Sequence, residues 1–182
     1  KADKQMSLEI ALNAKMRRTG ICGATETLLC HKDSSQNILP EIITKLIEKG
    51  CEVRGDKTVQ SINNNVKPAS NKDWQTEYLD SIISIKIVND VFDAIEHIEK
   101  YGSNHTDAII TNNIRNAEIF LNNVNSAIVI HNASTQYADG GEFGMGAEMG
   151  IATGKLHARG PVALEELTTY KYQLRGKGQV RP

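Results

Sequence analysis

The fold class is decided by the stretch SIISIKIVNDVFDAIEHIEKYGSNHTDAIIT at residues 81–111. It begins with SIISIKIV (81–88), an unbroken apolar and β-branched run that is typical of a strand buried on both faces of a sheet. The next residues predict a helix, with Asp90 as its N-cap and Gly102 at its end. DAIIT (107–111) is a second strand. Strand, helix and strand of these lengths predict a parallel βαβ unit.

The same alternation continues on both sides of this stretch. Toward the C-terminus we expect a helix at 113–124 and a strand at 126–132. Toward the N-terminus we expect a helix at 1–16, strands at 26–31 and 51–55, a helix at 41–50 that begins at Pro40, and an irregular excursion at 56–76. These elements predict an α/β fold for residues 20–132, with a parallel-rich sheet flanked by helices.

The composition changes after residue 132. Residues 133–160 hold seven of the chain's 14 glycines, and a long loop in a compact domain tends to be functional. We therefore expect two parts: a thiol-bearing α/β domain at 1–132, and a glycine-rich loop with a C-terminal segment at 133–182. Within the second part, residues 163–174 predict a helical turn followed by a strand-like TTYKYQL.

Composition and charge narrow the classes of function. The chain has 182 residues, is 40% hydrophobic and 24% charged, and carries a net charge of −1. This composition is typical of a soluble globular protein and favours neither nucleic acid nor a membrane as partner. Three cysteines without a CxxC pair, and scattered histidines, predict no metal site. Reduced thiols and the lack of a secretory signal predict a cytoplasmic protein.

One cysteine lies in an unusual setting, RRTGICGATETLL at 17–29. Cys22 has glycines on both sides and two arginines nearby. A thiolate forms more readily near positive charge, and flanking glycines let a substrate approach the backbone closely. Cys22 is therefore either a nucleophile or a small packing residue in a turn. Cys30 and Cys51 lie in apolar strand patterns, which favours core packing for both.

Three further stretches leave alternatives open. GGEFGMGAEMG (140–150) is similar to a phosphate-binding loop but fits neither GxGxxG nor a P-loop. KLHARGP (155–161) could form an anion site or a solvated basic edge. His105 precedes a strand, and ligands of parallel folds gather at the carboxyl ends of strands, so topology alone favours a structural role for it.

Three segments carry a resemblance to a known family: NAKMRRTGICGATETLL (13–29), SIKIVNDVFDAIEHIEKYGSNHTDAIIT (84–111) and the run SAIVIHNASTQYADGGEFGMGAEMGIATGKLHARGPVALEELTTYK (126–171). The sequence resembles the gamma-glutamyl phosphate reductases, which are glutamate-5-semialdehyde dehydrogenases of the aldehyde dehydrogenase superfamily. The resemblance covers about residues 7–172. It implies the catalytic and C-terminal part of that fold.

The resemblance also implies a reaction and its residues. L-Glutamate 5-phosphate would be reduced with NADPH to the 5-semialdehyde, in the second step of proline synthesis. Cys22 stands at the position of the catalytic cysteine and would form a thioacyl intermediate. Glu77 resembles the glutamate that binds the nicotinamide ribose. The alternative for Glu77 is a surface acid in a polar loop. His105, His157 and Arg159 would help to bind the substrate. The family also implies a homo-oligomer.

Two departures from the family pattern stand out. Gln136 occupies a position where the family usually has arginine, and Tyr137 follows it. The family's N-terminal dinucleotide-binding domain is not recognisable in this sequence, and it supplies most of the cofactor site. We expect the chain to be a fragment with little or no activity alone. The alternatives are a non-catalytic remnant that acts as a folded oligomerising domain, and an enzyme completed by a separate chain.

Overall fold

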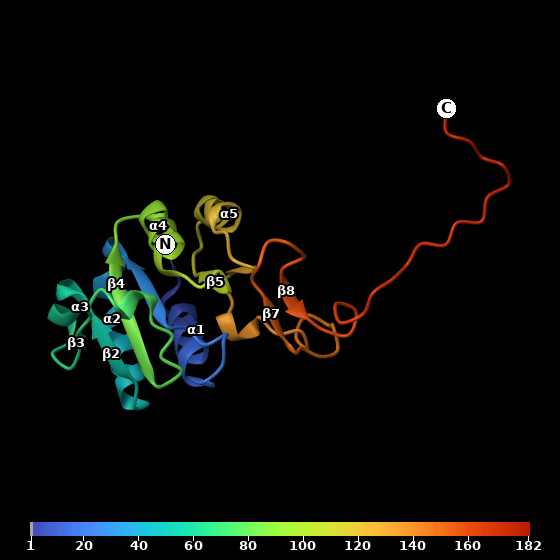
Figure 1. Cartoon of the computed structure of the whole chain (residues 1–182). Coiled ribbons are helices and arrows are strands. Elements are labelled where there is room, and N and C mark those ends of the chain that lie inside the picture. The colour runs from blue at the N-terminus through green and yellow to red at the C-terminus, as the bar shows by residue number, and fades with distance from the viewer. Residues whose placement is uncertain (1) are drawn as a thin grey trace.

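The computed structural model describes residues 2–182, and the expected α/β class is confirmed, with parallel strands flanked by helices (Figure 1). The helices are α1 (Lys4–Met16), α2 (Lys32–Glu48), α3 (Lys57–Ile62), α4 (Val91–Tyr101) and α5 (Ile114–Asn123), with 3-10 turns η1 (Asp73–Gln75) and η2 (Thr135–Tyr137). The strands are β1 (Thr27–His31), β2 (Glu52–Gly55), β3 (Lys67–Pro68), β4 (Ile82–Val88), β5 (Thr106–Ile109), β6 (Ile128–His131), β7 (Gly150–Ala152) and β8 (Gly160–Val162).

The strands form three separate ladders. The main sheet has four parallel strands in the order β1-β4-β2-β3, and Leu28 of β1 lies opposite Ile85 of β4. β5 and β6 form a second parallel pair, in which Thr106 lies opposite Ile128. β7 and β8 form a short antiparallel pair within the glycine-rich region. None of the ladders described for residues 2–182 joins β1 to β5.

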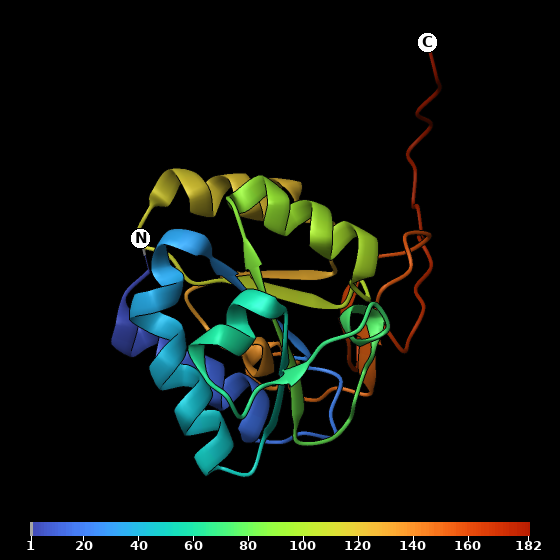
Figure 2. The same ribbon diagram turned by 90° about the vertical axis from the view of Figure 1, so that its left-hand side faces the viewer.

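Helices cover the strands from opposite sides. Figure 2 shows α4 and α5 side by side on one side of the strands, with α1 and α2 on the other. α1 contacts α2, and α4 contacts α5. The larger core cluster lies under α2 and includes the fully buried Leu39, Ile43, Leu46, Ile83 and Ile85. A smaller cluster joins α4 to α5 through Ile95, Phe120 and Val124.

Two expectations about the first half of the chain are wrong. α2 begins at Lys32, so Pro40 lies inside the helix and does not start it. The His31 ring starts this helix, because its Nδ1 accepts a hydrogen bond of 3.1 Å from the Asp33 amide. The expected irregular region 56–76 contains α3, β3 and η1. Asp56 begins α3, since its carboxylate accepts from two amides of the first turn.

The C-terminal residues leave the folded body. A turn follows β8, and the remaining chain runs outward without pairing (Figure 1). The strand-like TTYKYQL segment is therefore not a strand. Its apolar side chains are largely exposed, with Tyr172 at 91% and Leu174 at 96%.

Candidate active site

Cys22 lies in the loop between α1 and β1. The loop is tied at both ends by backbone hydrogen bonds, 3.0 Å from the Ala24 amide to the Ile21 carbonyl and 2.9 Å from the Thr25 amide to the Ala14 carbonyl. Within this frame the Cys22 side chain is exposed. The loop therefore presents the sulfur and does not bury it in the core.

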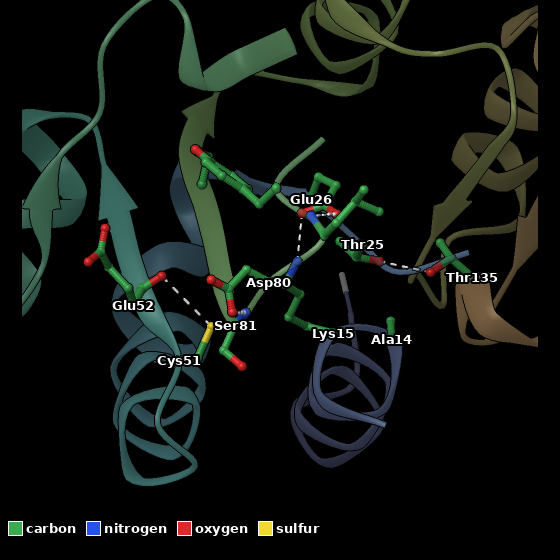
Figure 3. Close-up of polar contacts among 12 residues, drawn as sticks. Ala14, Lys15, Thr25, Glu26, Cys51, Glu52, Asp80, Ser81 and Thr135 are labelled. Atoms are coloured by element: carbon green, nitrogen blue, oxygen red, sulfur yellow. Dashed lines mark hydrogen bonds and ion pairs between the residues drawn. The ribbon is translucent and has the colours of Figure 1, made fainter. Parts of the chain in front are cut away.

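The start of the glycine-rich region holds this loop in place. The Thr135 hydroxyl donates to the Gly23 carbonyl at 2.7 Å, and it lies 2.9 Å from the Thr25 hydroxyl, as Figure 3 shows for the two threonines. A Cβ on Gly23 would come within 3.3 Å of the Thr135 carbonyl oxygen. A side chain at position 23 would therefore crowd a segment more than a hundred residues away.

Gln136 adds a second tie to the same loop. Its side chain is 7% exposed, and its Nε2 donates to the carbonyls of Ala14 at 2.8 Å and Arg18 at 3.1 Å. Its Oε1 accepts from the Arg17 guanidinium at 3.4 Å. The Gln136 amide therefore donates to two backbone carbonyls and accepts from Arg17. An arginine at position 136, as the resemblance implies, would place a second guanidinium beside Arg17.

A cavity of about 690 Å³ opens beside Cys22. Cys22, Glu77, His105 and Thr135 all line it, although they come from four separate segments of the chain. Cys22, Glu77 and His105 each precede a strand, so they gather at the amino ends of the strands. His105 stands at the amino end of its strand, as expected, and this is also the side of the sheet where Cys22 lies.

The electrostatic surroundings of Cys22 differ from the expectation. Burial raises the pKa of the Cys22 thiol above its ordinary value, and the nearby carboxylates of Glu148 and Glu77 raise it further. The backbone N–H groups of Cys22 and Gly23 favour the thiolate and lower that pKa, with a smaller effect than burial. The main charged groups that act on the sulfur are thus carboxylates and not the two arginines. The resting thiol is therefore protonated at neutral pH.

His105 presents a neutral ring at this site. Burial lowers its pKa, and the carboxylates of Glu148, Glu77 and Asp107 act in the opposite direction. Its Nδ1 lies 2.8 Å from the Thr106 hydroxyl. Its Nε2 is buried and has no hydrogen-bond partner within the described residues. One ring nitrogen is thus free for a ligand or a proton.

Hydrogen bonds on both sides fix the segment that carries Glu77. The Tyr78 hydroxyl donates to Asp73 at 2.6 Å and lies 2.7 Å from the Ser84 hydroxyl of β4. Asp73 is 5% exposed and also accepts from Arg54 at 2.7 Å. These contacts anchor η1 and the residues after it to the main sheet, so Glu77 approaches the cavity on a fixed backbone.

A buried ion pair lies beneath the Cys22 loop. Lys15 is fully buried, and its ammonium donates to a Glu26 carboxylate oxygen at 2.6 Å (Figure 3). The other oxygen of Glu26 accepts from the Leu79 amide at 3.4 Å. Burial raises the pKa of Glu26 despite this partner. The pair joins α1 to the residue before β1 and to the approach to β4.

The other predicted residues lie apart from this cavity. Cys30 and Cys51 are buried, and burial raises the pKa of each thiol to about 11. His157 is exposed, and Arg159 donates to the Asn125 carbonyl at 2.8 Å. Neither of these two lines the cavity. Their predicted role in substrate binding stays a prediction.

Sequence reasoning missed Glu148. Its carboxylate accepts a hydrogen bond of 2.8 Å from the Gly140 amide, which folds the glycine-rich loop back on itself. Gly144 and Gly146 have φ of 78° and 80°, a region open to glycine, and allow this turn. The position of Glu148 near Cys22 depends on that loop closure, so no local motif indicates it.

Residues 2–182 hold neither a candidate metal centre nor a candidate membrane span. No group of three or more histidine, cysteine, aspartate or glutamate side chains among them is arranged to hold a metal ion. No helix in the same range combines the length and apolar character needed to cross a membrane.

The chain is similar to known protein sequences, although not to a family model. No family model matches the sequence. A gamma-glutamyl phosphate reductase of Rhodopseudomonas palustris strain TIE-1 is 60% identical over 181 residues, and that of Parvibaculum lavamentivorans is 61% identical over the same length. Each match covers all of this chain but only 42% and 43% of the relative. The chain therefore spans about two fifths of the length of these relatives.

Solved structures agree with the sequence relatives. The gamma-glutamyl phosphate reductase of Thermotoga maritima is 48% identical, with a TM-score of 0.95, and is matched over 100% of this chain and 44% of its own. The Saccharomyces cerevisiae enzyme of that name is 30% identical, with a TM-score of 0.61 and matches over 98% and 40%. An acetylating aldehyde dehydrogenase from Geobacillus thermoglucosidasius shares the fold at a TM-score of 0.68. Along its whole length, the chain is thus a homologue of part of the gamma-glutamyl phosphate reductases.

Proposed function

We propose that this chain carries the thiol-bearing part of an NADPH-dependent reductase. The enzyme would convert L-glutamate 5-phosphate into L-glutamate 5-semialdehyde and phosphate, the second step of proline synthesis. The observation that carries this proposal is the exposed sulfur of Cys22 on a cavity that Glu77 and His105 also line. The relatives' names support the same reaction. We expect little or no activity from this chain alone.

In the first chemical step, Cys22 acts as the nucleophile. The exposed Cys22 thiol releases its proton to solvent, and the thiolate then attacks the acyl carbon of the substrate and forms a carbon–sulfur bond. The bond from that carbon to the phosphate oxygen breaks, and phosphate leaves with the electron pair. The backbone N–H groups of Cys22 and Gly23 favour negative charge at this place. A thioacyl group on Cys22 results.

Glu77 fits the proposed cofactor contact. It is an exposed carboxylate on the cavity that also holds Cys22, and a carboxylate is a strong acceptor for the hydroxyls of a ribose. NADPH, when bound, supplies a hydride to the thioacyl carbon. The carbon–sulfur bond then breaks, the carbon keeps the hydrogen as an aldehyde, and Cys22 recovers its electron pair. No water takes part, so no carboxylate is needed to activate one.

The substrate has two anionic ends that need partners. The free nitrogen of His105 is suited to a phosphate oxygen beside the thiol. Arg159 and His157 would bind the substrate carboxylate only if the loop that carries them moved toward the cavity. The division into a thiol-bearing domain at 1–132 and a C-terminal part at 133–182 belongs to the same proposal.

Competitive thiol labelling tests the role of Cys22. We expect an alkylating reagent to modify Cys22 well before Cys30 and Cys51, because those two thiols are buried with a pKa of about 11. Mass spectrometry of digested samples gives the order of modification. Cys22→Ser is the control and should abolish the fast phase. Equal, slow modification of the three cysteines would contradict the proposal.

A reconstitution experiment tests the reaction itself. The chain is mixed with the dinucleotide-binding domain of a relative, and oxidation of NADPH is followed with the acyl phosphate as substrate. Turnover that disappears in Cys22→Ser supports the reductase. Turnover that survives in this variant would remove Cys22 from the mechanism.

A second candidate function is self-association without catalysis. Exposed apolar side chains are concentrated in the C-terminal part, where Leu164, Tyr170 and Leu174 are 70%, 81% and 96% exposed. Burying these side chains against a second copy would remove apolar area from water and so favour association. Sedimentation of the full chain and of a chain ending at residue 163 measures this association. A monomer in both would exclude this candidate.

A further inference from the structure

The turn η2 reaches the Cys22 loop through the side chain of Thr135. The Thr135 hydroxyl donates to the Gly23 carbonyl at 2.7 Å and lies 2.9 Å from the Thr25 hydroxyl. A hydroxyl carries one proton and a carbonyl can only accept, so the proton of Thr135 is committed to Gly23. The Thr25 hydroxyl is therefore the donor to Thr135 (Figure 3). This directed relay joins the residue after Cys22 to the segment that leads into β1.

Gln136 makes the second contact, at the end of α1. The last carbonyls of a helix have no partner within the helix. The Nε2 of Gln136 has two protons, which go to the carbonyls of Ala14 at 2.8 Å and Arg18 at 3.1 Å. The Ala14 carbonyl also accepts from the Thr25 amide at 2.9 Å. The end of α1 and the exit of the Cys22 loop thus meet at one carbonyl, which also binds a side chain 122 residues away.

The backbone of η2 is itself held by hydrogen bonds. Ser134 caps the turn, because its hydroxyl accepts from the Gln136 amide at 3.2 Å and its carbonyl accepts from the Tyr137 amide at 2.9 Å. The turn also contacts α1 and β5. Thr135 and Gln136 therefore approach the Cys22 loop from a fixed position.

The Cys22 loop contains two amides that are free to face a ligand. Neither the Cys22 amide nor the Gly23 amide donates to a backbone carbonyl of residues 2–182. Both favour negative charge on the sulfur. Glycine has wide backbone freedom, so an unrestrained Gly23 would let these amides turn away. The hydrogen bond from Thr135 to the Gly23 carbonyl restricts that freedom.

We propose that Thr135 and Gln136 are positioning residues for the nucleophile. From η2 they hold the Cys22 loop in the conformation that keeps its two free amides available to the thiolate and to the acyl group that it attacks. The inference rests on the proposed function, because it concerns the same thiol. Neither side chain acts on the substrate itself, since the hydroxyl proton of Thr135 and the amide protons of Gln136 are bound to α1 and the loop. The reactivity of Cys22 therefore depends on the docking of the segment that follows β6.

The pH profile of Cys22 alkylation tests Thr135. Thr135→Val keeps the size of the side chain and removes the hydroxyl, so the two amides lose their fixed direction and the pKa of Cys22 should rise. We expect roughly three- to tenfold slower alkylation at pH 8, with an unchanged limiting rate at high pH. A purely structural role predicts the opposite sign. Burial is the main cause that raises the pKa of Cys22, so a loosened and more exposed loop would lower it.

Three variants isolate the effect of the hydroxyl. Thr135→Ser keeps the hydroxyl and should restore the profile of the unaltered chain. Thr58→Val makes the same change at an exposed site on α3 and should leave the profile unchanged. The carboxylates of Glu148 and Glu77 also act on the sulfur, and Glu148 lies in the loop that follows η2. The shift caused by Thr135→Val should therefore persist in the Glu148→Gln background.

Amide hydrogen exchange tests Gln136. Gln136→Met has a similar size but no donor, so the Ala14 carbonyl keeps only the Thr25 amide and the end of α1 loosens. We expect roughly tenfold faster exchange of the Thr25 amide, with α4 unchanged. Gln5→Met, at an exposed position of α1, is the matched control and should leave the Thr25 amide unchanged.

Two results would overturn the proposal. The first is an unchanged or lowered pKa of Cys22 in Thr135→Val, or a failure of Thr135→Ser to restore the profile. The second is unchanged exchange of the Thr25 amide in Gln136→Met. The proposed function fails on a different result, when Cys22 of the unaltered chain reacts no faster than the two buried cysteines. The shift caused by Thr135→Val can be measured in that case as well.

Discussion

At the scale of single residues, two carboxylates near Cys22 oppose formation of its thiolate. We predict that Glu148→Gln lowers the pKa of Cys22 and increases its alkylation rate at pH 8, roughly two- to tenfold, because the rate follows the thiolate fraction. Stopped-flow alkylation with mass-spectrometric assignment gives this rate. Glu142→Gln, an exposed residue of the same loop, is the control. An unchanged rate in Glu148→Gln would show that this carboxylate does not act on the sulfur.

The Lys15–Glu26 pair is a second feature of residue scale. Glu26→Gln leaves the ammonium of a fully buried lysine without its carboxylate, and we predict a loss of roughly 3–5 kcal/mol in the free energy of unfolding. The double variant Lys15→Met with Glu26→Gln should lose less, because it buries no unpaired charge. Chemical denaturation measures both. Equal losses would mean that the charge on Lys15 is not what makes the single variant unstable.

At the scale of elements, α4 begins as its sequence indicates. The Asp90 carboxylate accepts hydrogen bonds of 2.9 Å from the amides of Phe92 and Asp93. Asp90→Ala leaves both donors without this partner, and we predict a loss of about 1 kcal/mol in the free energy of unfolding. Asp90→Asn keeps an acceptor and should retain most of the stability. Denaturation curves that do not separate the two variants would refute the capping role.

The elements also show where local signals were sufficient. The apolar run 81–88 and the Asp90 cap predict β4 and α4 correctly, because a β-branched run and a side-chain cap act within a few residues. Pro40 misled the prediction of α2. Proline favours a first turn by its fixed φ, but the ring of His31, a residue of the preceding strand, caps a helix that begins eight residues before Pro40.

At the scale of the whole molecule, His97 joins α4 to the main sheet and to η1. It is 5% exposed, its Nδ1 lies 3.1 Å from the Lys86 ammonium of β4, and its ring meets that of Trp74 at 5.6 Å. Burial first, and then Lys86, lower the pKa of His97 to about 4, while Asp93 raises it and Lys100 lowers it slightly. The ring is therefore neutral throughout the ordinary working range of pH.

This neutral histidine makes stability depend on pH. Between its unfolded pKa of 6.5 and its folded pKa of about 4, the unfolded chain binds more protons at this residue than the folded chain. We predict that stability falls as the pH falls through this window, by up to about 3 kcal/mol from this residue. His97→Gln should flatten this part of the profile. The free energy of unfolding of the unaltered chain and of His97→Gln is measured at pH 7 and pH 4.5, with the fluorescence of Trp74, the single tryptophan, as the signal. Parallel profiles would exclude His97 as the source.

The arrangement of the candidate site could be predicted only in part. The glycines around Cys22 left both a nucleophile and a packing residue open, and the structure shows that the side chain is exposed. The arginines four and five residues before Cys22 misled the electrostatic expectation, because Arg17 turns toward Gln136 and the carboxylates of Glu77 and Glu148 act on the sulfur instead. A charge close in sequence need not be close in space.

The sequence by itself determined the α/β class, most of the helices and strands and the kinship of the chain, because these follow from local periodicity, capping and motif identity. Only the tertiary structure decided that Cys22 is exposed, that Cys22, Glu77 and His105 line one cavity, and that the charge of Glu148 acts on Cys22 and His105. Those relations join segments far apart in the chain. They depend on strand order and on loop closure. Packing between distant segments determines both, so no local sequence pattern predicts them.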